Sequence, residues 1–219
     1  MALLRPVYWE AVSPVLQKLL IFCGSQGYAV RFYLAGGTGL ALRLGHRRSV
    51  DLDFFSQADE VHFQTRQEVI RAFTSLAAHV VENTNGNLLF LVEDVHVGFF
   101  AYGYSLLQPT EEVEGVQVAS LVDIGLMKLD ALIGRGSRKD FYDVYAVAQH
   151  IPLADLLEKG KEKYPYVRDF ALMAVESMLL FENADRDRQP ELLVNVPWEE
   201  VRQYFLETGK SLGEKWFRV

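Results

Sequence analysis

Residues 33–56 read YLAGGTGLALRLGHRRSVDLDFFS, and their last part holds two carboxylates separated by one leucine. In an extended strand, alternate side chains point to the same face, so Asp51 and Asp53 project together while Leu52 points into the core. Their Cα atoms would lie about 6.6 Å apart, at about 3.3 Å rise per residue. This spacing lets both carboxylates bind one divalent cation or flank a pair of cations.

The residues around this acid pair are suited to bind phosphate. Gly36 and Gly37 predict a turn between a strand and a short helix. Backbone N–H groups at a glycine turn and a helix start form an anion site, and glycine lets a phosphate approach closely. Thr38 can cap the helix or contact a phosphate. Arg47 and Arg48 follow the helix, and guanidinium groups match phosphate oxygens.

The residues alone leave other interpretations of this segment open. The glycine spacing superficially suggests a dinucleotide-binding fingerprint, but its third small position is Leu42 and the next strand arrives too early. An Asp-x-Asp pair by itself favours a solvent-exposed strand edge, because charged residues are usually exposed. The glycine turn and the arginine-rich loop favour a metal and phosphate site instead.

Two blocks of the sequence match motifs of a known family. The first holds a glycine pair, a helix and an acidic strand, and reads Gly36-Gly37-Thr38 followed by Gly45-His46-Arg47-x-Ser49-x-Asp51-Leu52-Asp53. The second holds a helical lysine and a K-D-x-x-D motif, and reads Met127-Lys128-Leu129 followed by Lys139-Asp140-Phe141-Tyr142-Asp143. Both blocks, in this order, resemble the AbiEii/AbiGii toxin family of the nucleotidyltransferase superfamily, over residues 33 to about 150.

The resemblance implies roles for individual residues. The implied metal ligands are Asp51 and Asp53, and the catalytic group also includes Lys128 and Asp140. The implied nucleotide-binding residues are Gly36, Gly37, Thr38, Arg47, Ser49, Lys128 and Asp143. Without the resemblance, Lys128 would be interpreted as a solvent-facing lysine and Asp140 as a helix-capping carboxylate.

One carboxylate that the resemblance leads us to expect is missing. Nucleotidyltransferases usually take a third carboxylate from the strand next to the acid pair, and here that strand carries Gly98 at the matching position. The groups that could compensate are His96, Glu93 and Asp140. We therefore expect the chain to bind Mg·NTP but to turn it over slowly, and we expect Gly98→Asp to raise activity.

Composition limits the partners of the chain. The 219 residues have a net charge of −7, which gives no global attraction to nucleic acid. An RNA substrate would need a local basic patch, for which the candidates are Arg43, Arg47, Arg48, Arg135, Arg138 and Lys139. The single Cys23 allows no intramolecular disulfide, and the five histidines show no paired spacing for zinc. With no membrane span and no signal peptide in the sequence, we expect a cytoplasmic protein.

The remaining sequence predicts a mixed sheet followed by helices. Pro14 predicts a break or a start in a helix over 8–24, and Asn85-Gly86 predicts a type I′ hairpin. Capping-box patterns begin at Ser120 and Ser137. We therefore expect an α+β nucleotidyltransferase fold, with an α/β domain over 1–118 and a helical region over 119–219 that completes the active-site cleft.

These observations predict transfer of a nucleoside monophosphate from an NTP to an acceptor hydroxyl, with Mg²⁺ or alternatively Mn²⁺. The resemblance implies a tRNA 3′ end or other RNA as acceptor, and a toxin that is paired with a cognate antitoxin. Two alternatives are a small-molecule nucleotidyltransferase and a catalytically weak protein that binds a nucleotide or a partner. No membrane partner is expected.

Overall fold

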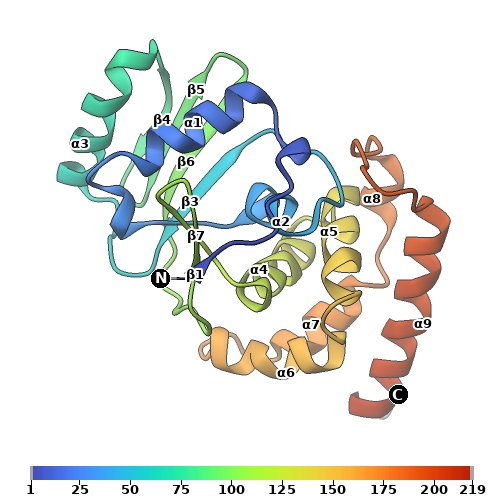
Figure 1. Cartoon of the computed structure of the whole chain (residues 1–219). Coiled ribbons are helices and arrows are strands. Elements are labelled where there is room, and N and C mark those ends of the chain that lie inside the picture. Colours follow the sequence, from blue (N-terminus) through green and yellow to red (C-terminus); the bar gives the residue numbers. More distant parts are fainter. Residues whose placement is uncertain (1, 218–219) are drawn as a thin grey trace. The chain divides into compact units, whose positions relative to one another are not determined.

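The computed structural model describes residues 2–217, and these form two compact units (Figure 1). The first unit is Met1–Ser120 and contains the β-sheet, whereas the second, Leu121–Val219, is built of helices. A mixed sheet with flanking helices and a helical C-terminal half confirms the predicted α+β class. None of the described helices is long and apolar enough to cross a membrane.

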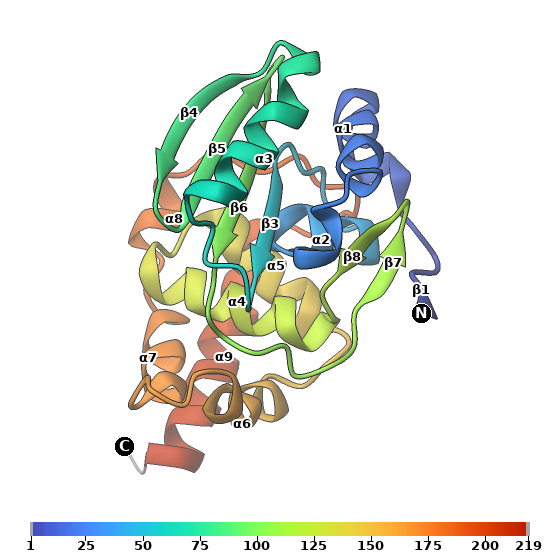
Figure 2. The same cartoon turned by 90° about the vertical axis from the view of Figure 1, so that its left-hand side faces the viewer.

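Within residues 2–217 the strands form one eight-stranded sheet in the order β1-β7-β8-β2-β3-β6-β5-β4 (Figure 2). The strands are β1 (Ala2–Leu3), β2 (Tyr33–Leu34), β3 (Leu52–Ser56), β4 (His79–Thr84), β5 (Asn87–Val92), β6 (Val95–Ala101), β7 (Glu111–Val113) and β8 (Val116–Val118). The pairs β1/β7, β2/β8 and β3/β6 are parallel, and the other neighbours are antiparallel. The sheet therefore places β6, which carries Gly98, directly beside the strand of the acid pair, as we expected for the strand that usually supplies a third carboxylate.

The helix before β3 begins earlier than the sequence predicted. α2 spans Gly36–Leu44, so the glycine pair forms its first turn and not a separate turn. Gly36 has a φ of +60°, a backbone conformation that residues with a side chain rarely adopt. This glycine lets the chain pass from β2 straight into α2.

An aromatic core covers one face of the sheet in the first unit. Phe99 of β6 lies within this core, and the ring centroids of Phe73 and Phe99 are 5.9 Å apart. The helices α1 (Pro14–Gly24) and α3 (Phe63–Phe73) meet in this core, where the rings of Phe22 and Phe73 pack edge to face at 5.5 Å. On this face of β6, Val95, Val97 and Phe99 are therefore buried.

The start of α1 and its single thiol agree with the sequence. Pro14 opens the helix, and the hydroxyl of Ser13 accepts a hydrogen bond from the backbone N–H of Leu16 at 3.1 Å. Cys23 is buried, and burial raises the pKa of its thiol to about 12. The thiol is therefore protonated and unreactive at neutral pH.

The predicted hairpin is present, but its turn type is different. β4 and β5 pair antiparallel on either side of Asn85-Gly86. Gly86 has a φ of +88°, whereas Asn85 is not among the residues with positive φ. A type I′ turn needs positive φ at both central residues, so that part of the prediction is wrong. The register shift between Val80 and Glu82 accommodates an extra residue in the edge strand β4.

The second unit has its own aromatic core. Its helices are α4 (Leu121–Gly134), α5 (Arg138–Ala148), α6 (Leu153–Lys163), α7 (Phe170–Ser177), α8 (Glu182–Arg186) and α9 (Trp198–Phe217). The ring of Phe141 packs against those of Phe181, Trp198 and Phe205, with centroids 5.0 to 5.6 Å apart. Helix α9 begins directly after Pro197.

A buried ion pair joins two helices of the second unit. The ammonium of Lys163 on α6 donates to the carboxylate of Asp123 on α4 at 2.8 Å, and both side chains are fully buried. Asp123 was predicted to belong to a capping box that starts at Ser120, but the structure pairs its carboxylate with Lys163. The pairing follows from burial, because an unpaired carboxylate is costly to remove from water.

We predict that Phe99→Ala lowers the free energy of unfolding by about 3 to 5 kcal/mol, because it leaves a cavity among packed rings. Urea denaturation measures this change. The matched control is Val30→Ala, since Val30 is 85% exposed and should shift stability by less than about 0.5 kcal/mol. Equal stability of the two variants would contradict the assignment of Phe99 to the core.

Candidate active site

The acid pair lies where β3 begins. Asp51 directly precedes β3 and Asp53 is its second residue. Both carboxylates are partly exposed, whereas Leu52 between them is fully buried. The alternation that the sequence predicted is therefore present, and it leaves both acids open to a ligand.

The glycine pair lies against two charged groups of the site. A Cβ added to Gly36 would lie 2.8 Å from a carboxylate oxygen of Asp53. A Cβ added to Gly37 would lie 2.8 Å from Nη2 of Arg47 and 3.1 Å from Oγ of Ser49. The structure thus gathers the predicted residues Gly36, Gly37, Arg47, Ser49 and Asp53 around the start of α2.

Thr38 contacts the loop before β3. Its hydroxyl lies 2.8 Å from Oγ of Ser49 and also contacts the backbone carbonyl oxygen of Asp51. The side chain is buried, and it makes no capping hydrogen bond, because Ala35 is the N-cap residue of α2. The predicted capping role is therefore wrong. Thr38 instead ties the first turn of α2 to the backbone of the first acid.

The arginines of the predicted basic patch differ in what they contact. Arg47 is buried, and its guanidinium donates to the carbonyl oxygen of Arg48 at 2.9 Å. Arg43 donates to the carbonyl oxygens of Ala119 at 2.8 Å and Val118 at 3.2 Å, and pairs with Glu111. Arg43 therefore joins α2 to the end of β8. It was predicted as a candidate RNA contact, and the structure gives it this structural role instead.

The strand β6 brings His96 and Gly98 beside the acids. Asp53 and Gly98 are aligned in the β3/β6 register, and Nδ1 of His96 lies 3.2 Å from Oδ1 of Asp51. Among the described residues, no group of three or more His, Cys, Asp or Glu side chains is placed to hold a metal ion. Of the predicted compensating groups, His96 is the one that reaches a carboxylate of the acid pair.

An aromatic ring covers the position where a third carboxylate was expected. A Cβ added to Gly98 would overlap with the ring of Phe100. That ring packs on Phe55 of β3, with centroids 5.5 Å apart. That the Phe100 ring covers position 98 was not predicted from the sequence. The signal was available, because alternation along β6 puts positions 98 and 100 on the same face.

The second predicted block forms a buried network of charges in the helical unit. Nζ of Lys128 lies 2.7 Å from Asp143 and 3.7 Å from Asp140, and both carboxylates are fully buried. Lys128 is itself 5% exposed, so the solvent-facing interpretation is wrong. The structure thus joins three residues of the second block, Lys128, Asp140 and Asp143.

Asp140 is held in the charged form by its neighbours. Arg135 donates two hydrogen bonds to its carboxylate, each of 2.7 Å, and the hydroxyl of Ser137 donates a third at 2.5 Å. Burial alone would raise the pKa of Asp140, but these hydrogen bonds and the charge of Lys128 hold it below its usual value. The predicted capping box is wrong here too, because Ser137 bonds to the carboxylate and makes no side-chain cap.

Arg138 has a structural role in the same unit. It donates to the carbonyl oxygens of Ala184 at 2.7 Å and Asp185 at 2.9 Å, and its guanidinium lies 5.0 Å from the centroid of the Trp198 ring. Lys139, another residue predicted to belong to the basic patch, is exposed. A continuous basic track is therefore not supported by these contacts.

Structural comparison finds proteins with the same fold. MenT4, a nucleotidyltransferase toxin from Mycobacterium tuberculosis H37Rv, is similar with a TM-score of 0.58 and 19% identity, over 93% of this chain and 85% of that one. JHP933 from Helicobacter pylori is similar with a TM-score of 0.53 and 16% identity, over 93% and 91% of the two chains. At these identities the likeness shows the shared fold.

Sequence comparison covers most of the chain. An uncharacterized protein of Aquifex aeolicus (strain VF5) is 34% identical over 196 residues, which is 87% of this chain and 92% of that protein. The family described as nucleotidyl transferase AbiEii toxin, of type IV toxin–antitoxin systems, matches residues 20–90 and 104–211. The family model covers most of the chain, and the chain therefore belongs to this AbiEii family and is a nucleotidyltransferase enzyme.

Proposed function

We propose that this enzyme transfers a nucleoside monophosphate from an NTP to an acceptor hydroxyl at the site around α2 and β3. The observation that carries this proposal is the approach of Asp53 and Arg47 to the glycine pair. A carboxylate for a cation and a guanidinium for phosphate lie on either side of a helix N-terminus, which itself favours anions. A metal-bound triphosphate needs this combination of groups.

The donor set fits a magnesium ion that is shared with the nucleotide. Mg²⁺ is usually bound by one or two carboxylates together with substrate phosphates and water, and Asp51 and Asp53 supply two carboxylates. When bound, the ion would neutralise charge on the phosphates. Mn²⁺ has similar ligand preferences and is the alternative. His96 would orient Asp51, and Thr38 would fix the backbone of that residue.

Lys128 is the proposed second cation for the phosphates. An ammonium has three donors, and the two carboxylates around it hold it in one position. We therefore assign phosphate binding to Lys128, and positioning of Lys128 to Asp140 and Asp143. A cleft shared by this network and the acid pair stays a prediction.

The proposed acceptor is an RNA end, with a tRNA 3′ end as the specific candidate. It is supported by membership of a toxin family and by the fold shared with MenT4, a nucleotidyltransferase toxin. The family also supports a cognate antitoxin as partner. Because Arg43 and Arg138 are engaged in structural contacts, a short RNA end suits this chain better than a long duplex. The cover of Gly98 by Phe100 favours the catalytically weak alternative.

We predict that Asp51→Asn and Asp53→Asn each abolish transfer of labelled nucleotide to total RNA and weaken Mg²⁺-dependent NTP binding, because each removes a metal ligand. Radiolabelled NTPs, one at a time, report transfer, and calorimetry reports binding. The control is Asp155→Asn, a carboxylate of α6 outside the acid pair. The proposal would be overturned by unchanged Mg·NTP affinity in both variants.

A second prediction uses two buried lysines of the helical unit as a matched pair. Lys128→Met and Lys163→Met each leave a buried carboxylate without its cation, so each should cost about 3 to 5 kcal/mol of stability. We expect Mg·NTP affinity to fall about tenfold in Lys128→Met alone, because it alone removes a phosphate ligand. Calorimetry below the unfolding transition separates the effects. An equal loss of affinity in both variants would give Lys128 a purely structural role.

The missing carboxylate yields a third prediction. Gly98→Asp alone should destabilise the fold by about 1 to 3 kcal/mol, because its side chain must displace the Phe100 ring. With Phe100→Ala in the same chain the aspartate has room, and we expect the double variant to transfer nucleotide faster than Phe100→Ala alone. Transfer rates at saturating Mg·NTP measure this. Rapid transfer by the unmodified enzyme would show that a third carboxylate is dispensable.

A further inference from the structure

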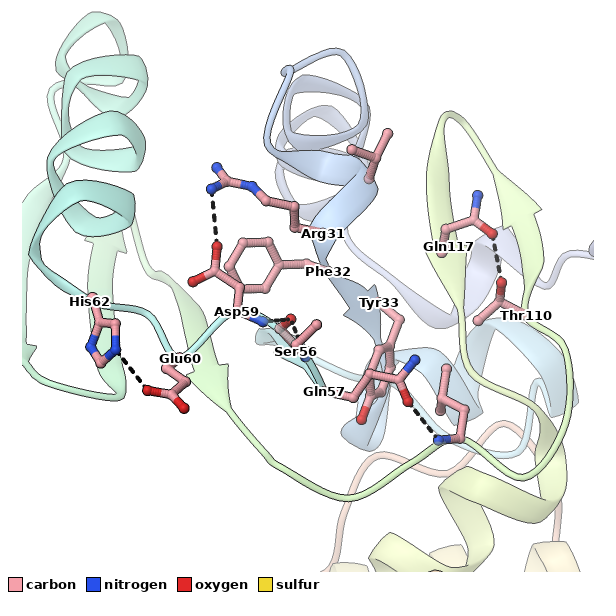
Figure 3. A pocket seen from close by; sticks show the side chains of 13 residues that line it. Arg31, Phe32, Tyr33, Ser56, Gln57, Asp59, Glu60, His62, Thr110 and Gln117 are labelled. Carbon is pink, nitrogen blue, oxygen red and sulfur yellow. Dashed lines mark hydrogen bonds and ion pairs between the residues drawn. The ribbon is translucent and has the colours of Figure 1, made fainter.

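A cavity of about 670 Å³ opens in the first unit at the end of β3 that lies away from the acid pair (Figure 3). It is lined by residues that enter β2, residues that leave β3, the loop before β7 and Gln117 of β8. Ser56 at its edge is three residues from Asp53, or about 10 Å along the strand at about 3.3 Å per residue. We propose that this cavity binds an uncharged nucleobase, presented by a free nucleoside or by the end of a single-stranded RNA.

The size and the aromatic lining of the cavity suit a planar ring. Small-molecule sites have volumes of about 300 to 1,000 Å³, so the cavity lies within that range. Figure 3 shows Phe32 and Tyr33 in its lining. Both rings are held by neighbours, since Phe32 packs on Phe99 at 5.3 Å and Tyr33 stacks on Phe55 at 6.1 Å. Both side chains are nearly buried, at 3% and 4% exposed, so they supply an apolar wall for the body of a base and no open face for stacking.

Two glutamines and one serine of the lining offer hydrogen-bond donors. The carboxamide oxygen of Gln57 accepts from the backbone N–H of Leu106 at 3.0 Å, and that of Gln117 accepts from the hydroxyl of Thr110 at 2.7 Å. Each glutamine therefore keeps its amide N–H groups as donors. The oxygen of Ser56 already accepts two backbone N–H groups, which leaves its O–H as a donor. Ring nitrogens and carbonyl oxygens of a base are matching acceptors.

The charge of the lining excludes phosphate from the cavity. Arg31 is the cation of the lining, and it is paired with Asp59 at 3.0 Å and with Glu68. Glu60 adds an exposed carboxylate next to His62. Carboxylates thus outnumber cations, so a triphosphate would be repelled here and attracted to the glycine turn. An uncharged base is compatible with both the aromatic and the polar parts of the cavity.

This inference deepens the proposed function, because a nucleobase in this cavity would belong to the acceptor. Its binding, however, needs neither metal nor transfer. The test therefore measures binding of adenosine, guanosine, cytidine and uridine to the full chain by calorimetry, without metal and without NTP. We expect at least one nucleoside to bind, and we expect ribose 5-phosphate, which has no base, not to bind.

Two variants locate the binding. Gln57→Ala removes an amide donor and should weaken the nucleoside about fivefold, whereas Ala58→Trp fills the cavity without removing a side-chain hydrogen bond and should abolish binding. Gln64→Ala, an exposed glutamine of α3 outside the lining, is the matched control and should bind like the unmodified chain. Circular dichroism checks that each variant is folded.

A last comparison identifies the source of the base. If the base comes from a strand, a short RNA that ends in the same nucleoside should bind about tenfold more tightly than the free nucleoside. If the ligand is a free nucleoside, the RNA and the nucleoside should bind equally tightly. In either case, binding should be lost in Ala58→Trp. The inference is overturned if no nucleoside binds, or if binding survives Ala58→Trp and is lost in Asp53→Asn. Failure of transfer with labelled NTP would overturn the proposed function and leave these binding results intact.

Discussion

The close approach between the start of α2 and the strand β3 is the constraint on which the site depends. Gly36 adopts a positive φ, and its missing side chain leaves room for the carboxylate of Asp53. Gly37 leaves room in the same way for the guanidinium of Arg47. A helix N-terminus favours anionic groups such as the carboxylate of Asp53, and this short segment is where we propose that a cation and a phosphate bind.

The helical unit depends on buried charges that satisfy one another. Lys128 is placed between Asp140 and Asp143, and Lys163 is paired with Asp123. Each pair is costly to remove from water, and each becomes strongly destabilising when a partner is lost. The two lysines differ in their sequence context, because only Lys128 lies in a motif of the AbiEii family. Burial of a lysine therefore does not by itself distinguish a structural cation from a phosphate ligand.

Local patterns predicted most of the fold and the first part of the site. Alternation placed Asp51 and Asp53 on one side of Leu52, Pro14 marked a helix start, and Asn85-Gly86 marked a hairpin. These features depend on backbone preferences of a few neighbouring residues, which the sequence displays directly. The same reasoning failed for the capping box at Ser137, because a serine followed three residues later by an acid does not reveal whether a cation competes for that acid.

The sequence by itself determined the acid pair, the glycine turn and the α+β class, since each follows from spacing within one segment. Only the tertiary structure decided that Arg43 holds the end of β8, that Phe100 covers Gly98, and that Lys128 is enclosed by two carboxylates. The cavity beside Tyr33 is also visible only in the tertiary structure. Each depends on partners that strand pairing or helix packing brings together, and such neighbours are set by the whole fold and not by local order along the chain.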